Sequence, residues 1–179
     1  MSPRSYREWR PVIGRNAWID PAAAVIGRVT IGEDSSIWPG AVVRGDVNAI
    51  EIGARTSIQD GSILHVASAR LAGAEGIPLV IGDDCTVGHR VILHACTVGN
   101  RCLIGMGAIV MDGAVIGDEV IVAAGSLVPA GKELPPRTLW IGSPARQQRA
   151  LQPDEIARLT ESAAHYVALK NEYLRQGPG

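Results

Sequence analysis

Three of the four histidines, His65, His89 and His94, lie in the middle of the sequence. Neutral imidazole is the commonest metal ligand in proteins, and three ligands around one ion leave a coordination position open for chemistry. The five-residue step from His89 to His94 does not put both rings on one helix face, where residues three or four apart align. A metal site therefore needs another kind of element to bring the rings together.

Branched aliphatic residues recur every six positions through most of the chain. The series comprises Ile13, Ile19, Val25, Ile31, Ile37 and Val43, then Ile52, Ile58 and Leu64, then Ile81, Val87 and Leu93, and then Val98, Ile104, Val110, Ile116, Val122 and Val128. A helix would repeat at 3.6 residues and a plain strand at 2. The observed period predicts short flat segments separated by turns, with one aliphatic side chain pointing inward from each. Three segments would close a triangular coil of about eighteen residues, and stacked coils would bury a dry aliphatic column.

This repeat assigns each histidine to a side of the triangle. His65 and His94 each directly follow an inward residue on the same side, so we predict that they share one outer column, one coil or about 4.8 Å apart. His89 comes two residues after Val87, on the third side, whose outward direction diverges by about 120°. Only a neighbouring chain could deliver that ring to the other two. Three chains around a threefold axis would do so three times, which predicts a homotrimer with metal sites between its subunits.

The same counting in sixes assigns other polar residues to sides of the triangle. Arg44 shares the column of the two paired histidines, whereas Gln59 and Asp60 share the side of the third. Facing subunits would set Arg44 against Asp60, and we expect that ion pair to orient the assembly more than to stabilise it. For Arg44, Asp46, Asp60 and Gln59, a solvated or purely structural role stays open beside a catalytic one.

The composition fits one domain with an aliphatic core. The chain has 179 residues, is 46% hydrophobic, contains no Phe and has 21 glycines, which indicate many tight turns. A net charge of −1 argues against nucleic acid as the main partner, and no apolar run is long enough to span a membrane. The start of the chain lacks a signal-peptide pattern. The three cysteines form no C-x-x-C motif, so a reduced, cytoplasmic setting is predicted.

Four segments are expected from these patterns. They are an N-terminal extension over 1–12, a β-helix over 13–128, a turn-rich linker over 129–152 and a helix packed on the solenoid over 153–175. The helix is predicted because apolar residues follow a helical stripe from Ile156 to Leu174 and because Pro153 suits a first turn. Residues 66–80 are expected to form a loop thrown out of one coil.

Several stretches resemble the γ-class carbonic anhydrases. They are "RGDV", "IQDGSILH", "VGHRVILH", "GMGAIVMDGAVIG" and "AAGSLVP", and the similarity covers nearly the whole chain. The resemblance implies an all-β solenoid, namely a left-handed parallel β-helix with a C-terminal α-helix. It also implies a homotrimer in which His65 and His94 of one subunit and His89 of the next bind Zn²⁺. Fe²⁺ or Co²⁺ are alternatives, because histidine ligates all three metals.

The activity implied by this resemblance is the hydration of CO2 to bicarbonate by a metal-bound hydroxide. In the family pattern Gln59 would aim the hydroxide, and Arg44 and Asp46 would form the wall of the site. Asp60 would pair with the arginine. Tyr166, on the C-terminal helix, would lie near the metal.

The chain also departs from that pattern. Val47 stands where the archetypal enzymes have a glutamate, and the loop over 66–80 offers only Glu75 as a proton relay. These features resemble the shorter subclass of the family, in which hydration is often weak, absent or redox-dependent. Three alternatives stay open on the same scaffold: a hexapeptide acyltransferase, for which "GSPAR" at 142–146 is typical, a CoA-thioester hydrolase, and a non-catalytic metal-binding assembly subunit.

Overall fold

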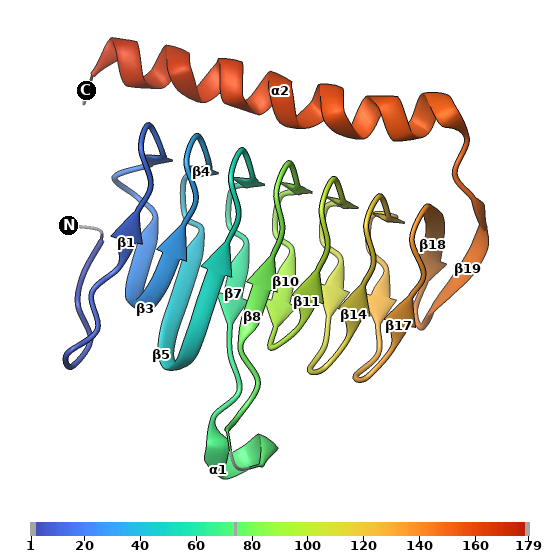
Figure 1. The fold of residues 1–179 in the computed structure, drawn as a ribbon, viewed down its shortest axis with the longest axis horizontal. Helices are drawn as coiled ribbons and strands as arrows, with labels where there is room; N and C mark the ends of the chain where they lie inside the picture. The colour runs from blue at the N-terminus through green and yellow to red at the C-terminus, as the bar shows by residue number, and fades with distance from the viewer. Residues whose placement is uncertain (1–2, 74, 178–179) are drawn as a thin grey trace.

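The structure, a computed structural model, describes residues 3–73 and 75–177. Figure 1 shows a column of short strands stacked side by side, with one long helix, α2 (Pro153–Gln176), running along it. The strands of successive coils pair in parallel. The predicted hexapeptide-repeat β-solenoid with a C-terminal helix is therefore confirmed.

Three faces make up the column. The first face consists of β7 (Ile63–His65), β10 (Ile92–His94), β13 (Ile109–Val110) and β16 (Leu127–Val128). The second consists of β1 (Val12–Ile13), β8 (Leu79–Ile81), β11 (Thr97–Val98), β14 (Val115–Ile116) and β17 (Glu133–Leu134). The third consists of β2 (Trp18–Ile19), β4 (Ser36–Ile37), β6 (Ser57–Ile58), β9 (Thr86–Val87), β12 (Leu103–Ile104), β15 (Ile121–Val122) and β18 (Thr138–Gly142). The longer strands β3 (Ala24–Ile31) and β5 (Val42–Ile52) each bend from the first face to the second.

The core is the column of inward residues that the six-residue period predicts. Val87 pairs in register with Ile58 on one side and Ile104 on the other, and all three are fully buried. Burial of such branched side chains is the main favourable term for a solenoid, since each coil contacts only its neighbours. Glycine follows many inward residues because the coils approach closely there. A Cβ on Gly105 would lie 2.4 Å from the backbone nitrogen of Ala124.

The linker predicted over 129–152 is corrected by the structure. Strands β17 and β18 continue the parallel pairing, and β19 (Ala145–Ala150) then returns antiparallel to β18. The six-residue period in fact persists through Leu134 and Trp140, which are both buried. The prediction failed because these two residues replace the β-branched type and because prolines lie between them, which favoured a linker.

The loop expected over 66–80 leaves the column between β7 and β8, as Figure 1 shows, and carries the short helix α1 (Ala69–Ala72), whereas Leu79 and Val80 belong to β8. Asn48 holds it by donating hydrogen bonds from Nδ2 to the carbonyl oxygens of Ala67 and Glu75. The loop is thus tied to the solenoid at its base.

The three cysteines, Cys85, Cys96 and Cys102, are free and buried. Burial raises the pKa of Cys96 to about 12. Cys85 and Cys102 instead donate from Sγ to the carbonyl oxygens of Gly99 and Gly117 in the next coil. They serve as small core residues.

Helix α2 packs on the third face, along β4, β6 and β9. Leu159 and Ala163 are buried against the solenoid. Farther along, the Lys170 ammonium is fully buried and donates to the Asp34 carboxylate at 2.6 Å and to the Asn16 carbonyl oxygen at 2.7 Å. Within the described residues, no helix combines the length and the apolar character needed to cross a membrane.

Replacing Asp34 with asparagine should loosen this helix. The substitution leaves the buried Lys170 charge without its anion, which is expected to cost about 2 kcal/mol of unfolding free energy. Asparagine tolerates the positive φ of 56° at position 34, so the backbone itself adds no strain. Urea unfolding of both proteins measures the difference, with Glu33→Gln as a control at a more exposed pair. Equal stability of Asp34→Asn and the wild type would contradict this role of the ion pair.

Candidate metal centre

His65 and His94 lie side by side on the first face. They end β7 and β10 and are paired in register, as the repeat predicts. The Nδ1 atom of His65 is 3.1 Å from the Nε2 atom of His94. One coil of the solenoid thus brings two nitrogens, 29 residues apart in sequence, into direct contact.

Two carboxylates determine which nitrogens of this pair carry protons. The Asp46 carboxylate lies 3.0 Å from Nε2 of His65, and the Asp112 carboxylate lies 2.6 Å from Nδ1 of His94. An ionised carboxylate only accepts hydrogen bonds, so in both neutral rings the proton sits on the nitrogen that faces the aspartate. The remaining lone pairs, on Nδ1 of His65 and Nε2 of His94, then point at each other.

A shared cation fits between these two lone pairs. Two nitrogens at the usual bond length from one tetrahedral zinc are about 3.3 Å apart, close to the 3.1 Å observed between the rings. Carboxylates on the outer nitrogens are also the usual partners of metal-binding histidines. Within the described part of the chain, no group of three histidine, cysteine or acidic side chains is placed to hold a metal ion.

The electrostatics around His65 favour its metal-binding form. Burial lowers the pKa of His65, although the hydrogen bond to Asp46 acts in the opposite direction. Burial also tends to raise the pKa of Asp46, but the hydrogen bonds from His65 and Arg44 outweigh it and lower that pKa. A neutral imidazole beside an ionised carboxylate is thus the stable pair at neutral pH.

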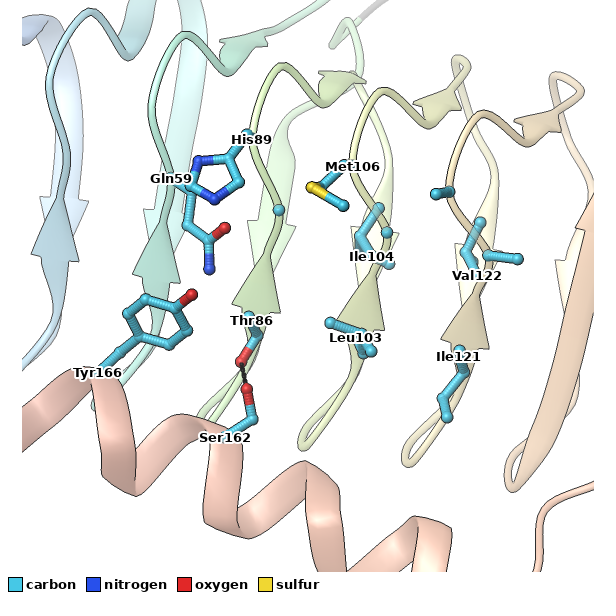
Figure 2. Close-up of a pocket in the computed structure, with 14 residues that line it drawn as sticks. Gln59, Thr86, His89, Leu103, Ile104, Met106, Ile121, Val122, Ser162 and Tyr166 are labelled. Atoms are coloured by element: carbon cyan, nitrogen blue, oxygen red, sulfur yellow. Dashed lines mark hydrogen bonds between the residues drawn. The ribbon is translucent and has the colours of Figure 1, made fainter.

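His89 lies on the third face, away from the pair, in the turn after β9. Its Nδ1 donates to the Asp60 carboxylate at 2.9 Å, which leaves the lone pair of Nε2 free. Figure 2 shows the ring next to Gln59, with Tyr166 of α2 facing the same space. The structure therefore brings together His89, Asp60, Gln59 and Tyr166 as a second group.

Arg44 and Asp60 have partners inside the chain. Arg44 pairs with Asp46, and Asp60 pairs with His89. The ion pair of Arg44 with Asp60 across a subunit interface stays a prediction. So does the joining of the two groups of site residues.

The chain is similar to several known proteins. Residues 10–45 and 95–130 match the family model "Bacterial transferase hexapeptide (six repeats)". Protein YrdA of Escherichia coli is 52% identical over 97% of this chain and 95% of its own length. The carbonic anhydrase of Geobacillus kaustophilus is 44% identical over 95% of this chain and 89% of its own length. The chain belongs to the γ-class carbonic anhydrase family of hexapeptide-repeat proteins.

Solved structures of similar chains share the whole architecture. A hexapeptide transferase family protein from Anaplasma phagocytophilum is 42% identical, with a TM-score of 0.88 over 95% of this chain and 96% of its own length. Members of the γ-class carbonic anhydrase family and proteins named as transferases therefore share one scaffold. The side chains, rather than the fold, must separate their activities.

Asp112 is a site residue that the sequence reasoning missed. It comes two residues after the inward Val110, on the first face and one coil beyond His94. That is the same place in the six-residue unit as Asp60 and His89 occupy on the third face. One more coil along the histidine column reaches Met111, so Asp112, the next residue, is found only when the neighbouring position on that face is counted as well.

Replacing Asp112 with alanine should weaken metal binding about 10–100-fold, the usual effect of losing such an outer partner. The His94 ring would lose the acceptor that keeps its proton on Nδ1, so Nε2 would no longer be reserved for the metal. Competition with a coloured chelator measures the affinity. Asp112→Asn, which keeps an acceptor oxygen, should recover most of it. Wild-type affinity in Asp112→Ala would contradict this assignment.

Proposed function

We propose that this chain is a γ-class carbonic anhydrase that hydrates CO2 to bicarbonate at metal sites between the subunits of a homotrimer. The metal proposed first is Zn²⁺, with Fe²⁺ or Co²⁺ as alternatives. Relatives named carbonic anhydrase over most of the chain support the reaction class. A cytoplasmic location is part of the same proposal.

One observation carries the proposal. Each of the three histidines donates one N–H to its own aspartate and keeps the other nitrogen free: His65 with Asp46, His94 with Asp112 and His89 with Asp60. Two of the free nitrogens converge on the first face, and the third lies on another face. Because the faces diverge, a second copy of the chain is the economical source of the third ligand.

The proposed ligands would hold the metal with three neutral nitrogens. A divalent metal with such ligands and an open position lowers the pKa of bound water to about 7, which supplies a nucleophile at neutral pH. Gln59 and His89 line the same pocket, so the side-chain amide of Gln59 would be available to orient the attacking oxygen by a hydrogen bond. Arg44 holds Asp46, which in turn holds His65, so the arginine acts as a positioning residue.

Metal analysis combined with a CO2 hydration assay tests this function. Purified protein should contain about one metal ion per chain, because each trimer would hold three sites. Stopped-flow hydration should be measured under oxidising and reducing conditions, since members of the shorter subclass are expected to differ between them. Metal without hydration under both conditions would point to an assembly subunit and overturn the enzymatic proposal.

Acyl transfer is the second candidate, supported by the match to the transferase hexapeptide model and by the transferase family structure. An acyltransferase or CoA-thioester hydrolase on this scaffold has no need of three oriented histidines. Turnover of acetyl-CoA by metal-free protein would favour this candidate over the first.

A further inference from the structure

A groove runs along the third face, beside helix α2. It has a volume of about 380 Å³ and begins at Gln59, His89 and Tyr166. Figure 2 shows these three residues at one end, while Leu103 and Ile121 lie along the successive coils beyond them. A space of this size lies in the range that holds organic ligands and far exceeds what CO2 needs.

The sequence pattern explains why the groove is open. Gln59 directly follows an inward residue, and the equivalent positions in the next three coils are Gly88, Gly105 and Ala123, as the register of the strands shows. Their side chains are absent or small, so the floor beyond Gln59 is mostly backbone. Four coils at about 4.8 Å spacing give the groove a length of about 14 Å.

The walls of the groove are mostly apolar. Leu103 and Ile121 line the side next to α2, where the hydroxyls of Thr86 and Ser162 are hydrogen-bonded to each other, and Met106 lies on the other side (Figure 2). None of the described residues that line the groove is Lys, Arg, Asp or Glu. An ionised head group would therefore find no counter-ion along the groove and would depend on neutral hydrogen-bond donors at its end, whereas an aliphatic chain would bury its surface against these walls.

The end of the groove at Gln59 and Tyr166 supplies polar groups. Gln59 is only 3% exposed as a whole residue, and its amide forms no hydrogen bond with the other described residues. Because no buried side-chain nitrogen or oxygen among the described residues lacks a partner, the amide must reach the open space of the groove, where a ligand can replace its water. The Tyr166 hydroxyl faces the same space in Figure 2. Both groups can donate a hydrogen bond to a carboxylate or carbonyl oxygen.

We propose that this groove binds medium-chain aliphatic monocarboxylates, with the carboxylate at Gln59 and Tyr166 and the chain along Leu103 and Ile121. The inference goes beyond CO2 hydration: it shares Gln59 and His89 with the proposed metal site but rests on the pocket alone. It gives the chain a second class of ligand, which would occupy the space next to His89 and compete with hydration.

Calorimetric titration of the full chain with sodium octanoate and with sodium acetate tests the inference. Octanoate should bind at least tenfold more tightly than acetate, because only octanoate fills the apolar groove. Ala123→Leu, which places a branched side chain in the floor, should remove this difference and leave acetate binding as it was. Ala124→Leu serves the same purpose if the first variant does not fold.

Ala168→Leu, on the exposed side of α2, is the matched control and should bind octanoate like the wild type. Equal binding of octanoate and acetate, or full octanoate affinity in both groove variants, would overturn the inference. Its failure is distinguishable from that of the proposed function. Protein with metal and CO2 hydration but no preference for octanoate refutes only this inference, whereas protein that binds octanoate without metal refutes only the proposed function.

Discussion

Protein carrying His89→Ala should fold normally and contain almost no bound metal. The fold is retained because His89 lies outside the aliphatic column and only its exposed pairing with Asp60 is lost. The metal is lost because His65 and His94 then supply only two nitrogens, whereas the proposed sites need three ligands. Elemental analysis gives the metal content, and circular dichroism with thermal melting checks the fold.

Mixing two defective chains should restore part of the metal. His89→Ala keeps the paired histidines, and His94→Ala keeps His89, so an interface formed by one of each in the right order has all three ligands. Random assembly of equal amounts places about a quarter of the interfaces in that order. Metal content should therefore rise to about a quarter of the wild-type level after co-refolding, while each variant alone stays near zero.

If all the metal ligands came from a single chain, these two experiments would give different metal contents. Retention of metal by His89→Ala alone would show that one chain completes the site and would refute ligation across subunits. Absence of recovery in mixed trimers of confirmed composition would do the same. His165→Ala is the matched control, because this fourth histidine lies on an exposed part of α2 and should not affect metal content.

Ile116→Ala should destabilise the protein far more than Val115→Ala, although the two residues are neighbours in β14. Ile116 is 1% exposed and fills the column between Val98 and Leu134, whereas Val115 is 43% exposed. Truncation in the column leaves a cavity and costs about 2–5 kcal/mol. Truncation of the outward residue should cost less than about 0.5 kcal/mol.

Thermal unfolding at one protein concentration measures this contrast. For a chain of this length, a loss of about 3 kcal/mol lowers the melting temperature by roughly 6–12 °C. The second face is suitable for the test because it carries none of the residues proposed for the metal site. Similar melting temperatures for the two variants would mean that the column is not the source of stability.

The column of inward residues and the pairing of His65 with His94 could be predicted from the sequence. In a solenoid each residue's lateral neighbour is the equivalent residue one coil away, so counting in sixes is enough to find it. The same rule separated His89 from the pair. It would also have extended the solenoid to Trp140, had the count continued past changes of residue type.

Contacts between unlike elements could not be predicted in this way. The position of α2 depends on contacts such as Lys170 with Asp34, which are 136 residues apart and follow no repeat. The place of Tyr166 beside Gln59, and with it the groove, follows from that docking. The sequence by itself thus determined the β-solenoid and the columns of site residues, because both depend on local periodicity. Only the tertiary structure decided which nitrogens stay free and what space the helix encloses, because these depend on side-chain directions and long-range packing.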